Sequence, residues 1–252
     1  MKRLIAPAFA ALAVAGCLAC CTNAHATATT HIWAPSTDVQ AYRLWHVTAD
    51  MYLAVKNDAA GNRVPSVTNV GLTVGVLPFK RINMEIGADH KTGLGALDDF
   101  PMYGNVKIGI PEGAFGNGTP AAAVGVFDVG TKGGRTDFDV IYGEIARTFS
   151  ARGVSLGRLS AGYFMGNEHL LVDRQGKKDN TGLLAAWERT MTEVSDKLWL
   201  CVEYMGTESL YGTLNVGGSW KFANNVSMIF GYDIFNNSDL VNTVTVQVDI
   251  DI

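Results

Sequence analysis

Polar and apolar residues alternate along most of this chain, and the last ten residues, TVTVQVDIDI from Thr243 to Ile252, alternate without interruption. Blocks of about ten residues with the same alternation recur between clusters of Gly, Asn, Asp and Pro. Period-two alternation puts successive side chains on opposite faces of a β-strand, whereas an amphipathic helix repeats about every 3.6 residues. Helical periodicity is nearly absent. The pattern therefore predicts an all-β fold.

About twelve strands can be assigned from these blocks. They are expected at 45–55, 67–76, 82–89, 105–110, about 121–130, 138–149, 158–165, 183–188, 198–204, 210–222, 226–233 and 240–252. Either face can be the apolar one in the two blocks between 121 and 149, so their orientation stays open. The strand count is even, as in single-chain bacterial outer-membrane barrels.

The lengths of the connections alternate as well. If the mature chain starts in the periplasm, the periplasmic turns fall at 77–80, 111–120, 150–154, 192–197 and 223–225, and only 111–120 is long. The external connections include 57–66, 91–102, 130–136 and 166–180, which are mostly longer and richer in charge. Short periplasmic turns and longer external loops are typical of a transmembrane antiparallel up-and-down β-barrel.

The two faces of the strands differ in content. The apolar face carries almost no formal charge and has aromatic residues near the strand ends. Trp45, Phe149, Trp220 and Phe222 lie toward the expected periplasmic rim, and Tyr163, Tyr204 and Tyr232 toward the external rim. Two aromatic girdles of this kind mark the headgroup levels of a membrane barrel. A soluble β-sandwich also alternates and remains the alternative fold.

On these patterns the chain, from about residue 40 to residue 252, resembles a small porin-like bacterial outer-membrane β-barrel protein. The segment HIWAPSTDVQ, residues 31–40, is similar to the mature amino terminus of some uncharacterised proteins of this class. The resemblance implies insertion by the barrel-assembly machinery, which reads the C-terminal strand. Class members commonly end in an aromatic residue, and this chain ends in Ile252.

Residues 1–26 are expected to be a signal peptide, with the barrel domain at 27–252. Lys2 and Arg3 precede an apolar stretch, and Ala24-His25-Ala26 fits a signal-peptidase site. A lipobox ending at Cys17 is the competing cleavage site. Cleavage after Ala26 changes the 20 basic and 24 acidic side chains to 18 and 24, a net charge of −6, which argues against nucleic acid as a partner. Of the cysteines only Cys201 then remains, so no intrachain disulfide is expected.

The polar face carries the candidate pore-lining residues. They are Asp50, Glu85, Asp89, Lys107, Arg158, Glu188, Glu203, Lys221 and Asp233. Acids outnumber bases in this set, and rings of carboxylates in a wet lumen favour cations. The alternative is that these charges pair across a narrow interior and plug it.

No catalytic motif is present: the Gly-x-Ser-x-Gly elbow, His-Glu-x-x-His and the phosphate loop are all missing. A barrel lipid hydrolase with His46 or His90 as base is a minor alternative, and no enzymatic activity is expected. The acidic pairs Asp98-Asp99 and Asp137-x-Asp139 match no calcium loop and are interpreted as solvated loop charge. No cofactor or metal is expected.

The sequence thus predicts an outer-membrane channel that passes small polar solutes with a modest preference for cations. Lipid of the outer membrane and the assembly machinery are the expected partners. The main alternative is a structural or adhesive surface barrel that acts through its external loops, above all 166–180 with Lys177 and Lys178.

Overall fold

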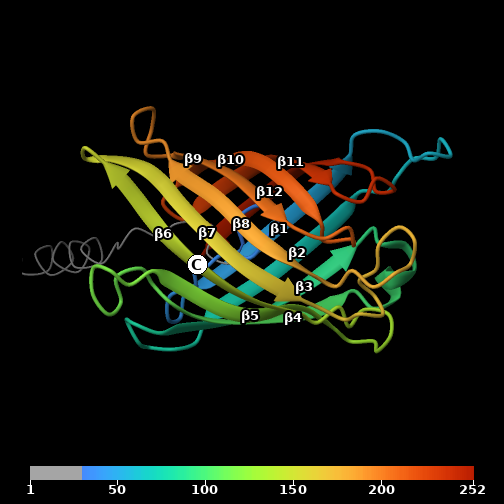
Figure 1. Cartoon of the computed structure of the whole chain (residues 1–252), viewed down its shortest axis with the longest axis horizontal. Coiled ribbons are helices and arrows are strands. Elements are labelled where there is room, and N and C mark those ends of the chain that lie inside the picture. The colour runs from blue at the N-terminus through green and yellow to red at the C-terminus, as the bar shows by residue number, and fades with distance from the viewer. Residues whose placement is uncertain (1–29) are drawn as a thin grey trace, which may run out of the picture.

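The computed structural model describes residues 30–252, so the predicted signal peptide and its cleavage site lie outside the described residues. Twelve tilted antiparallel strands form one closed barrel in sequence order (Figure 1). The strands are β1 (Trp45–Ala54), β2 (Val67–Gly75), β3 (Asn83–Thr92), β4 (Met102–Ile110), β5 (Ala121–Gly130), β6 (Val140–Ala151), β7 (Val154–Met165), β8 (Thr181–Thr190), β9 (Leu198–Met205), β10 (Thr213–Ala223), β11 (Val226–Phe235) and β12 (Thr243–Asp251). A 3₁₀ helix, η1 (Gly95–Asp99), lies between β3 and β4.

The regular C-terminal strand closes the barrel against the first strand. Nine consecutive residue pairs join β12 to β1, from Ala54 with Thr243 to His46 with Asp251. Beyond them, Trp45 and Ile252 exchange two backbone hydrogen bonds of 3.0 and 2.8 Å. Pairing every strand on both sides satisfies the backbone groups that an edge strand leaves open. The predicted up-and-down barrel is confirmed, and the sandwich is excluded.

The strand pattern also sets which residues face inward. In β12, Thr245 is fully buried while Val244 is on the outer surface. In β6, whose orientation the sequence left open, Val140, Tyr142, Glu144 and Ala146 face inward. β5 contains a β-bulge: its pairing with β4 skips a residue, and Asp128 has a left-handed φ of 53°. The bulge turns both Phe127 and Asp128 toward the interior, which no regular alternation indicates.

The two ends of the barrel differ. We call the end where β1 starts and β12 finishes the terminal end, and the opposite end the loop end. Figure 1 shows the long connections 55–66 and 166–180 at the loop end. The turn between β6 and β7 at the terminal end consists of Arg152 and Gly153, both with positive φ (52° and 79°). Two such residues make the turn type that matches the twist of a tight hairpin.

Two strand boundaries differ from the prediction. β7 starts at Val154, four residues before the expected start, because the chain reverses within two residues. β10 starts at Thr213, and the expected first residues Leu210 and Tyr211 belong to the preceding loop. Tyr211 is only 4% exposed because it turns into the barrel.

The outer wall is apolar and exposed. Side chains of the middle of the strands, such as Val124, Ile145 and Val216, are about half exposed or more. Trp45, Phe149, Trp220 and Phe222 are exposed near the terminal end, and Tyr163, Tyr204 and Tyr232 near the loop end. These are the two aromatic groups expected from the sequence. Within residues 30–252, no helix is both long and apolar enough to cross a membrane.

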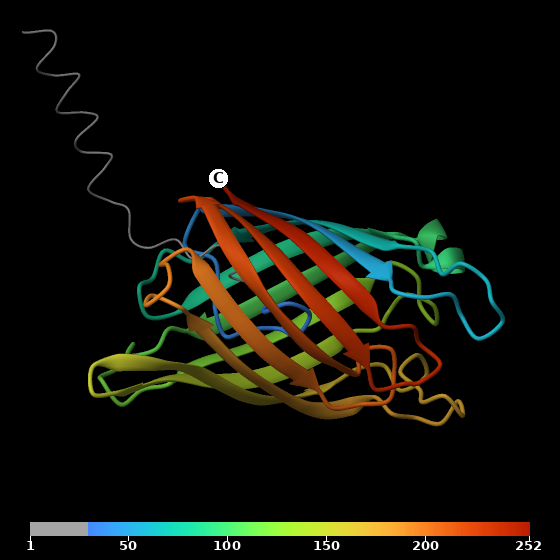
Figure 2. The same cartoon turned by 90° about the horizontal axis from the view of Figure 1, so that it is seen from above.

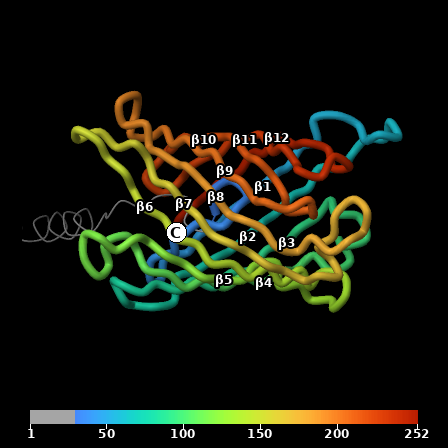
Figure 3. The backbone as a smooth tube through the Cα atoms, viewed as in Figure 1, coloured from blue at the N-terminus to red at the C-terminus, as the bar shows by residue number. Residues whose placement is uncertain are grey.

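Residues 30–44 precede β1, and we call them the N-terminal segment. Its residues from His31 to Gln40 are buried or half-buried inside the barrel. In Figure 2 this blue segment curves through the interior between the front and back strands, and the tube in Figure 3 shows it leading into β1 at the terminal end. Ile32 and Ala34 are 1% and 2% exposed. The sequence placed the barrel from about residue 40 onward and indicated no role for this segment in the lumen.

An apolar cluster fills part of the lumen near the loop end, on the side of β6 to β9. The inward side chains Phe164, Leu184 and Met205 pack there with residues of the loops. Leu171 from the 166–180 loop is completely buried in this cluster. The loop is therefore anchored inside the barrel and does not simply project outward.

Candidate functional site: the lumen and its cavity

Glu203 on β9 holds the start of the N-terminal segment. Its carboxylate accepts backbone hydrogen bonds from Ile32 (3.0 Å), Trp33 (2.7 Å) and Ala34 (3.0 Å). Asn215 on β10 donates a fourth hydrogen bond of 2.6 Å to the same carboxylate. A buried charge is stable only when hydrogen bonds replace its water. The segment supplies most of those bonds.

Four charged side chains hold the later part of the segment. The Glu85 carboxylate accepts the Gln40 N–H at 2.7 Å and lies 3.2 Å from the Lys107 ammonium. Lys107 Nζ donates to the backbone oxygen of Asp38 at 2.6 Å. Arg158 contacts both carboxylate oxygens of Asp38 at 2.8 Å and Glu188 at 3.3 Å. These charges pair with the N-terminal segment or directly with each other.

Burial alone would raise the pKa of the Asp38 carboxyl group, but the charge and hydrogen bonds of Arg158 outweigh burial and hold this pKa below its ordinary value. Asp38 is thus ionised when it binds Arg158. The interaction is a charge-assisted one, which is stronger than a neutral hydrogen bond.

Small inward residues make room for the segment. A Cβ atom on Gly75 of β2 would lie 2.0 Å from the backbone oxygen of Ala41. A Cβ atom on Gly217 of β10 would lie 2.9 Å from Ile32 Cδ1. These inward glycines therefore allow close packing of the N-terminal segment.

A cavity of about 310 Å³ remains between the N-terminal segment and the inner wall of β1 to β5. It extends from His46 and Thr73 near the terminal end to Leu94, Leu97 and Leu210 in the loops at the other end. This volume is at the lower end of the ligand-pocket range of about 300–1,000 Å³. The cavity follows the barrel axis along most of β1.

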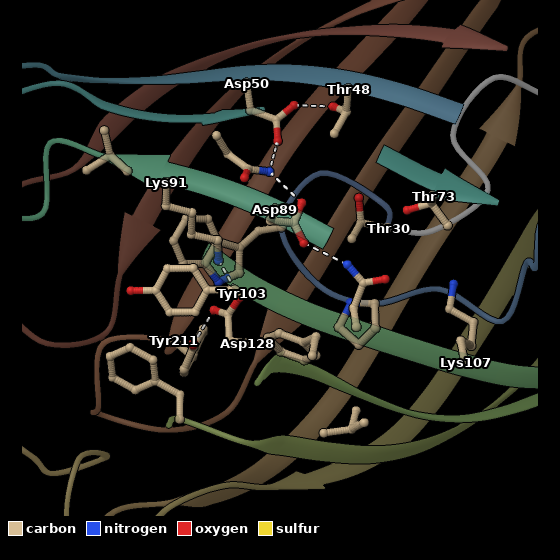
Figure 4. Close-up of a pocket in the computed structure, with 18 of the residues that line it drawn as sticks. Thr30, Thr48, Asp50, Thr73, Asp89, Lys91, Tyr103, Lys107, Asp128 and Tyr211 are labelled. Carbon is tan, nitrogen blue, oxygen red and sulfur yellow. Dashed lines mark hydrogen bonds and ion pairs between the residues drawn. The ribbon is translucent and has the colours of Figure 1, made fainter. Parts of the chain in front are cut away.

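A hydrogen-bonded row of side chains crosses this wall of the cavity (Figure 4). We call Asp50, Asn69, Asp89 and Asn105 the polar row; they come from β1, β2, β3 and β4 in turn. Asn69 Nδ2 donates to Asp50 (2.9 Å) and to Asp89 (3.2 Å). Asn105 Nδ2 donates to Asp89 at 2.7 Å, and Thr48 Oγ1 donates to Asp50 at 2.5 Å.

A second polar group lies toward the loop end of the same cavity (Figure 4). Lys91 Nζ donates to Asp128 at 2.5 Å and lies 5.2 Å from the centre of the Tyr103 ring. The Tyr211 hydroxyl donates to the other oxygen of Asp128. Burial, together with the charge of Asp128, holds the pKa of Tyr211 well above its ordinary value, so Tyr211 stays a donor.

The nine candidate pore-lining residues divide into groups. Asp50, Glu85, Asp89 and Lys107 line the cavity. Arg158, Glu188 and Glu203 contact the N-terminal segment or its ion pairs. Asp233 is fully buried and accepts a hydrogen bond of 2.6 Å from Thr243, while Lys221 is partly buried on the inward side of β10. Their role in lining an open pore stays a prediction.

Several inward residues were not found by sequence reasoning or lie in other elements than expected. Trp33 lies outside the strands, so alternation gives no signal for it. Tyr211 falls in the expected strand 210–222, but it reaches the cavity from the loop before β10. Phe127 and Asp128 face inward together because of the bulge in β5. Glu144, a further inward acid, is 4% exposed and was missed because either face of its strand could be the apolar one.

His46 has no free ring nitrogen for general-base chemistry. Its Nδ1 lies 2.9 Å from Asp251 and its Nε2 lies 3.3 Å from Asp249. His90 alternates to the outer face of β3, where it pairs with Val70 and Met102. Among residues 30–252, neither histidine has a serine as a hydrogen-bond partner, which a Ser–His hydrolase needs.

The two acidic pairs stabilise loops. Asp98 accepts the backbone N–H groups of Gly93 and Leu94 at 3.0 and 2.8 Å. Asp137 accepts hydrogen bonds from Arg135 and Asn167. Among residues 30–252, no group of three or more His, Cys, Asp and Glu side chains is arranged to hold a metal ion.

No protein-family model and no curated protein matches this sequence. Several solved structures are similar in shape. The COG4313 outer membrane channel from Pseudomonas putida F1 is 9% identical with a TM-score of 0.48, over 85% of this chain and 97% of that one. The NanC porin is 7% identical, with a TM-score of 0.47, over 82% and 98%. The Acinetobacter baumannii outer membrane protein Omp33 is 9% identical, with a TM-score of 0.44, over 83% and 98%.

Proposed function

We propose that this chain is an outer-membrane barrel that passes small polar solutes through a lumen narrowed by its own N-terminal segment. A closed barrel with an apolar outer wall and two aromatic girdles is suited to a bilayer, because lipid offers no hydrogen bonds to an open sheet edge. The charged interior is suited to water and polar solutes. The chain is accordingly located in the outer membrane.

The observation that carries the channel proposal is the elongated cavity beside β1 to β5. It runs from the terminal end toward the loops, and the carboxylates of Asp50 and Asp89 line it. Neither carboxylate has a Lys, Arg or His partner within 4.0 Å among the described residues. Carboxylates without a close ion-pair partner in a narrow passage attract cations and repel anions. We therefore propose a modest cation preference.

Conductance in a planar bilayer tests this function. The purified, folded protein should give discrete current steps, and a KCl gradient should give a reversal potential with the sign of cation preference. Asp50→Asn should reduce this preference, because it removes a lumenal charge without changing side-chain volume. Faster gel migration before boiling than after it serves as the control for a folded barrel.

If the folded protein gives no current steps in the bilayer, the channel proposal is wrong. That result would favour a second candidate, a surface barrel that binds through its loops, for which the anchoring of Leu171 in the apolar cluster is the supporting observation. A loop fixed at its base presents a defined surface at low entropic cost.

A further inference from the structure

The polar row lines the cavity and contains two hydrogen-bond acceptors that are not used. Because the amide nitrogens of Asn69 and Asn105 donate to carboxylates, their amide oxygens remain. Both oxygens are buried and accept no hydrogen bond from residues 30–252. The row therefore presents two amide oxygens and two carboxylates, and it calls for a ligand that donates hydrogen bonds and carries positive charge.

A further buried polar group points to the same place. Tyr103 is 2% exposed, and its hydroxyl has no hydrogen-bond partner among the described residues. It is directly opposite Asp89 in the register of β3 and β4 and lines the cavity. An unpaired polar group in a buried position costs free energy unless a ligand or water satisfies it.

Aromatic rings from the N-terminal segment, the strands and a loop also line the cavity. Trp33 of the N-terminal segment lies edge-on to Tyr52 with ring centres 5.1 Å apart. Trp33 and Tyr211 are 6.5 Å apart, and Phe127 and Tyr211 5.6 Å. Aromatic faces attract ammonium groups and pack against apolar carbon, so the cavity combines an apolar surface that attracts cations with anionic acceptors.

Lys91 shows that this wall already holds an ammonium group in such a setting. Its Nζ is bound by the Asp128 carboxylate and lies over the face of Tyr103. The polar row offers the same combination of carboxylate and aromatic ring, but no Lys, Arg or His side chain of residues 30–252 lies within 4.0 Å of its carboxylates.

We propose that the cavity binds small organic cations, with a protonated amine against the polar row and the apolar part of the molecule against Trp33 and Tyr52. This inference rests on the proposed function, since such amines would be solutes of the channel. The cavity of about 310 Å³ is large enough for a small ligand. A bare metal ion would make no use of the aromatic wall.

Isothermal titration of the detergent-solubilised, folded barrel with benzylamine at pH 7 tests the inference. We expect saturable binding, and at least about ten-fold weaker binding of benzyl alcohol, which has similar shape and no charge. Asp89→Asn should weaken benzylamine binding about ten-fold or more, since it removes one of the two charges of the row. Asp50→Asn is the second variant if Asp89→Asn does not fold.

Glu144→Gln is the matched control, because Glu144 is an inward acid that does not line the cavity. It should leave benzylamine binding unchanged. Equal binding of the amine and the alcohol would overturn the inference, as would equal losses in Asp89→Asn and Glu144→Gln.

The binding experiment and the conductance experiment test different claims, so either claim can be wrong while the other holds. A protein that conducts but does not bind benzylamine saturably would overturn the inference and leave the channel in place. A protein that binds benzylamine with the expected selectivity but never conducts would support the amine site and remove the channel.

Discussion

Carboxylates that face the lumen have different partners, although the alternation of the sequence places all of them on the same inward face. Glu203 accepts three consecutive backbone N–H groups of the N-terminal segment, whereas Asp89 accepts only side-chain amides and faces the cavity. Both acids sit at inward positions of their strands. The difference arises from a segment far away in the sequence, whose backbone binds Glu203 and does not bind Asp89.

Asp38 gives the N-terminal segment a pH dependence. Its pKa is lowered in the fold, chiefly by Arg158 acting against burial, so its stabilising effect is present above the ordinary aspartate pKa of about 3.9 and is lost as the pH falls through the lower folded value. We expect Asp38→Asn to lower the urea midpoint of unfolding at pH 7. At pH 2 to 3 the difference from the wild type should shrink.

Asp99→Asn is the control for this measurement, because Asp99 is an exposed loop acid. It should leave the urea midpoint near the wild-type value at both pH values. A midpoint difference for Asp38→Asn that grows as the pH falls would contradict the lowered pKa.

At the scale of elements, alternation located the strands where one face is purely apolar and the other purely polar, as in β12. It failed where both faces are apolar. β6 carries Val140 and Tyr142 inward as well as Ile141 and Ile145 outward, because its inner face packs in the apolar cluster. Local pattern cannot separate lipid contact from lumenal packing, since both environments exclude water.

Ile145→Arg tests whether the outer wall contacts lipid. Ile145 lies near the middle of β6 and is 55% exposed. A charge at this depth of a bilayer should destabilise the barrel by about 2–4 kcal/mol. Urea unfolding in lipid vesicles measures the change.

Val194→Arg provides the comparison. Val194 is 70% exposed in the turn between β8 and β9, where an arginine reaches water, so we expect little change. If both variants lose the same stability, the middle of the outer wall does not face lipid.

For the whole molecule, the N-terminal segment is the part that decides how much of the lumen is open. It crosses the interior and contacts β2, β3, β4, β7 and β9. Deleting residues 30–40 should raise the single-channel conductance several-fold in planar bilayers, because it empties the lumen beside the cavity.

Glu203→Gln is the milder variant if the deletion does not fold. It weakens the charge-assisted hydrogen bonds to Ile32, Trp33 and Ala34, so the open-channel current should fluctuate more than in the wild type. A folded deletion variant with unchanged conductance would show that the segment does not narrow the passage.

The sequence by itself determined the barrel: its strand count, its closure by TVTVQVDIDI and the outward or inward side of most residues. These follow from period-two alternation, which a strand imposes locally. Only the tertiary structure decided what fills the interior. The N-terminal segment lies in the lumen because Glu203, Glu85, Lys107 and Arg158, brought together from four strands, bind its backbone and Asp38. No spacing along the chain encodes that convergence, since it depends on the closed sheet placing those strands around one axis.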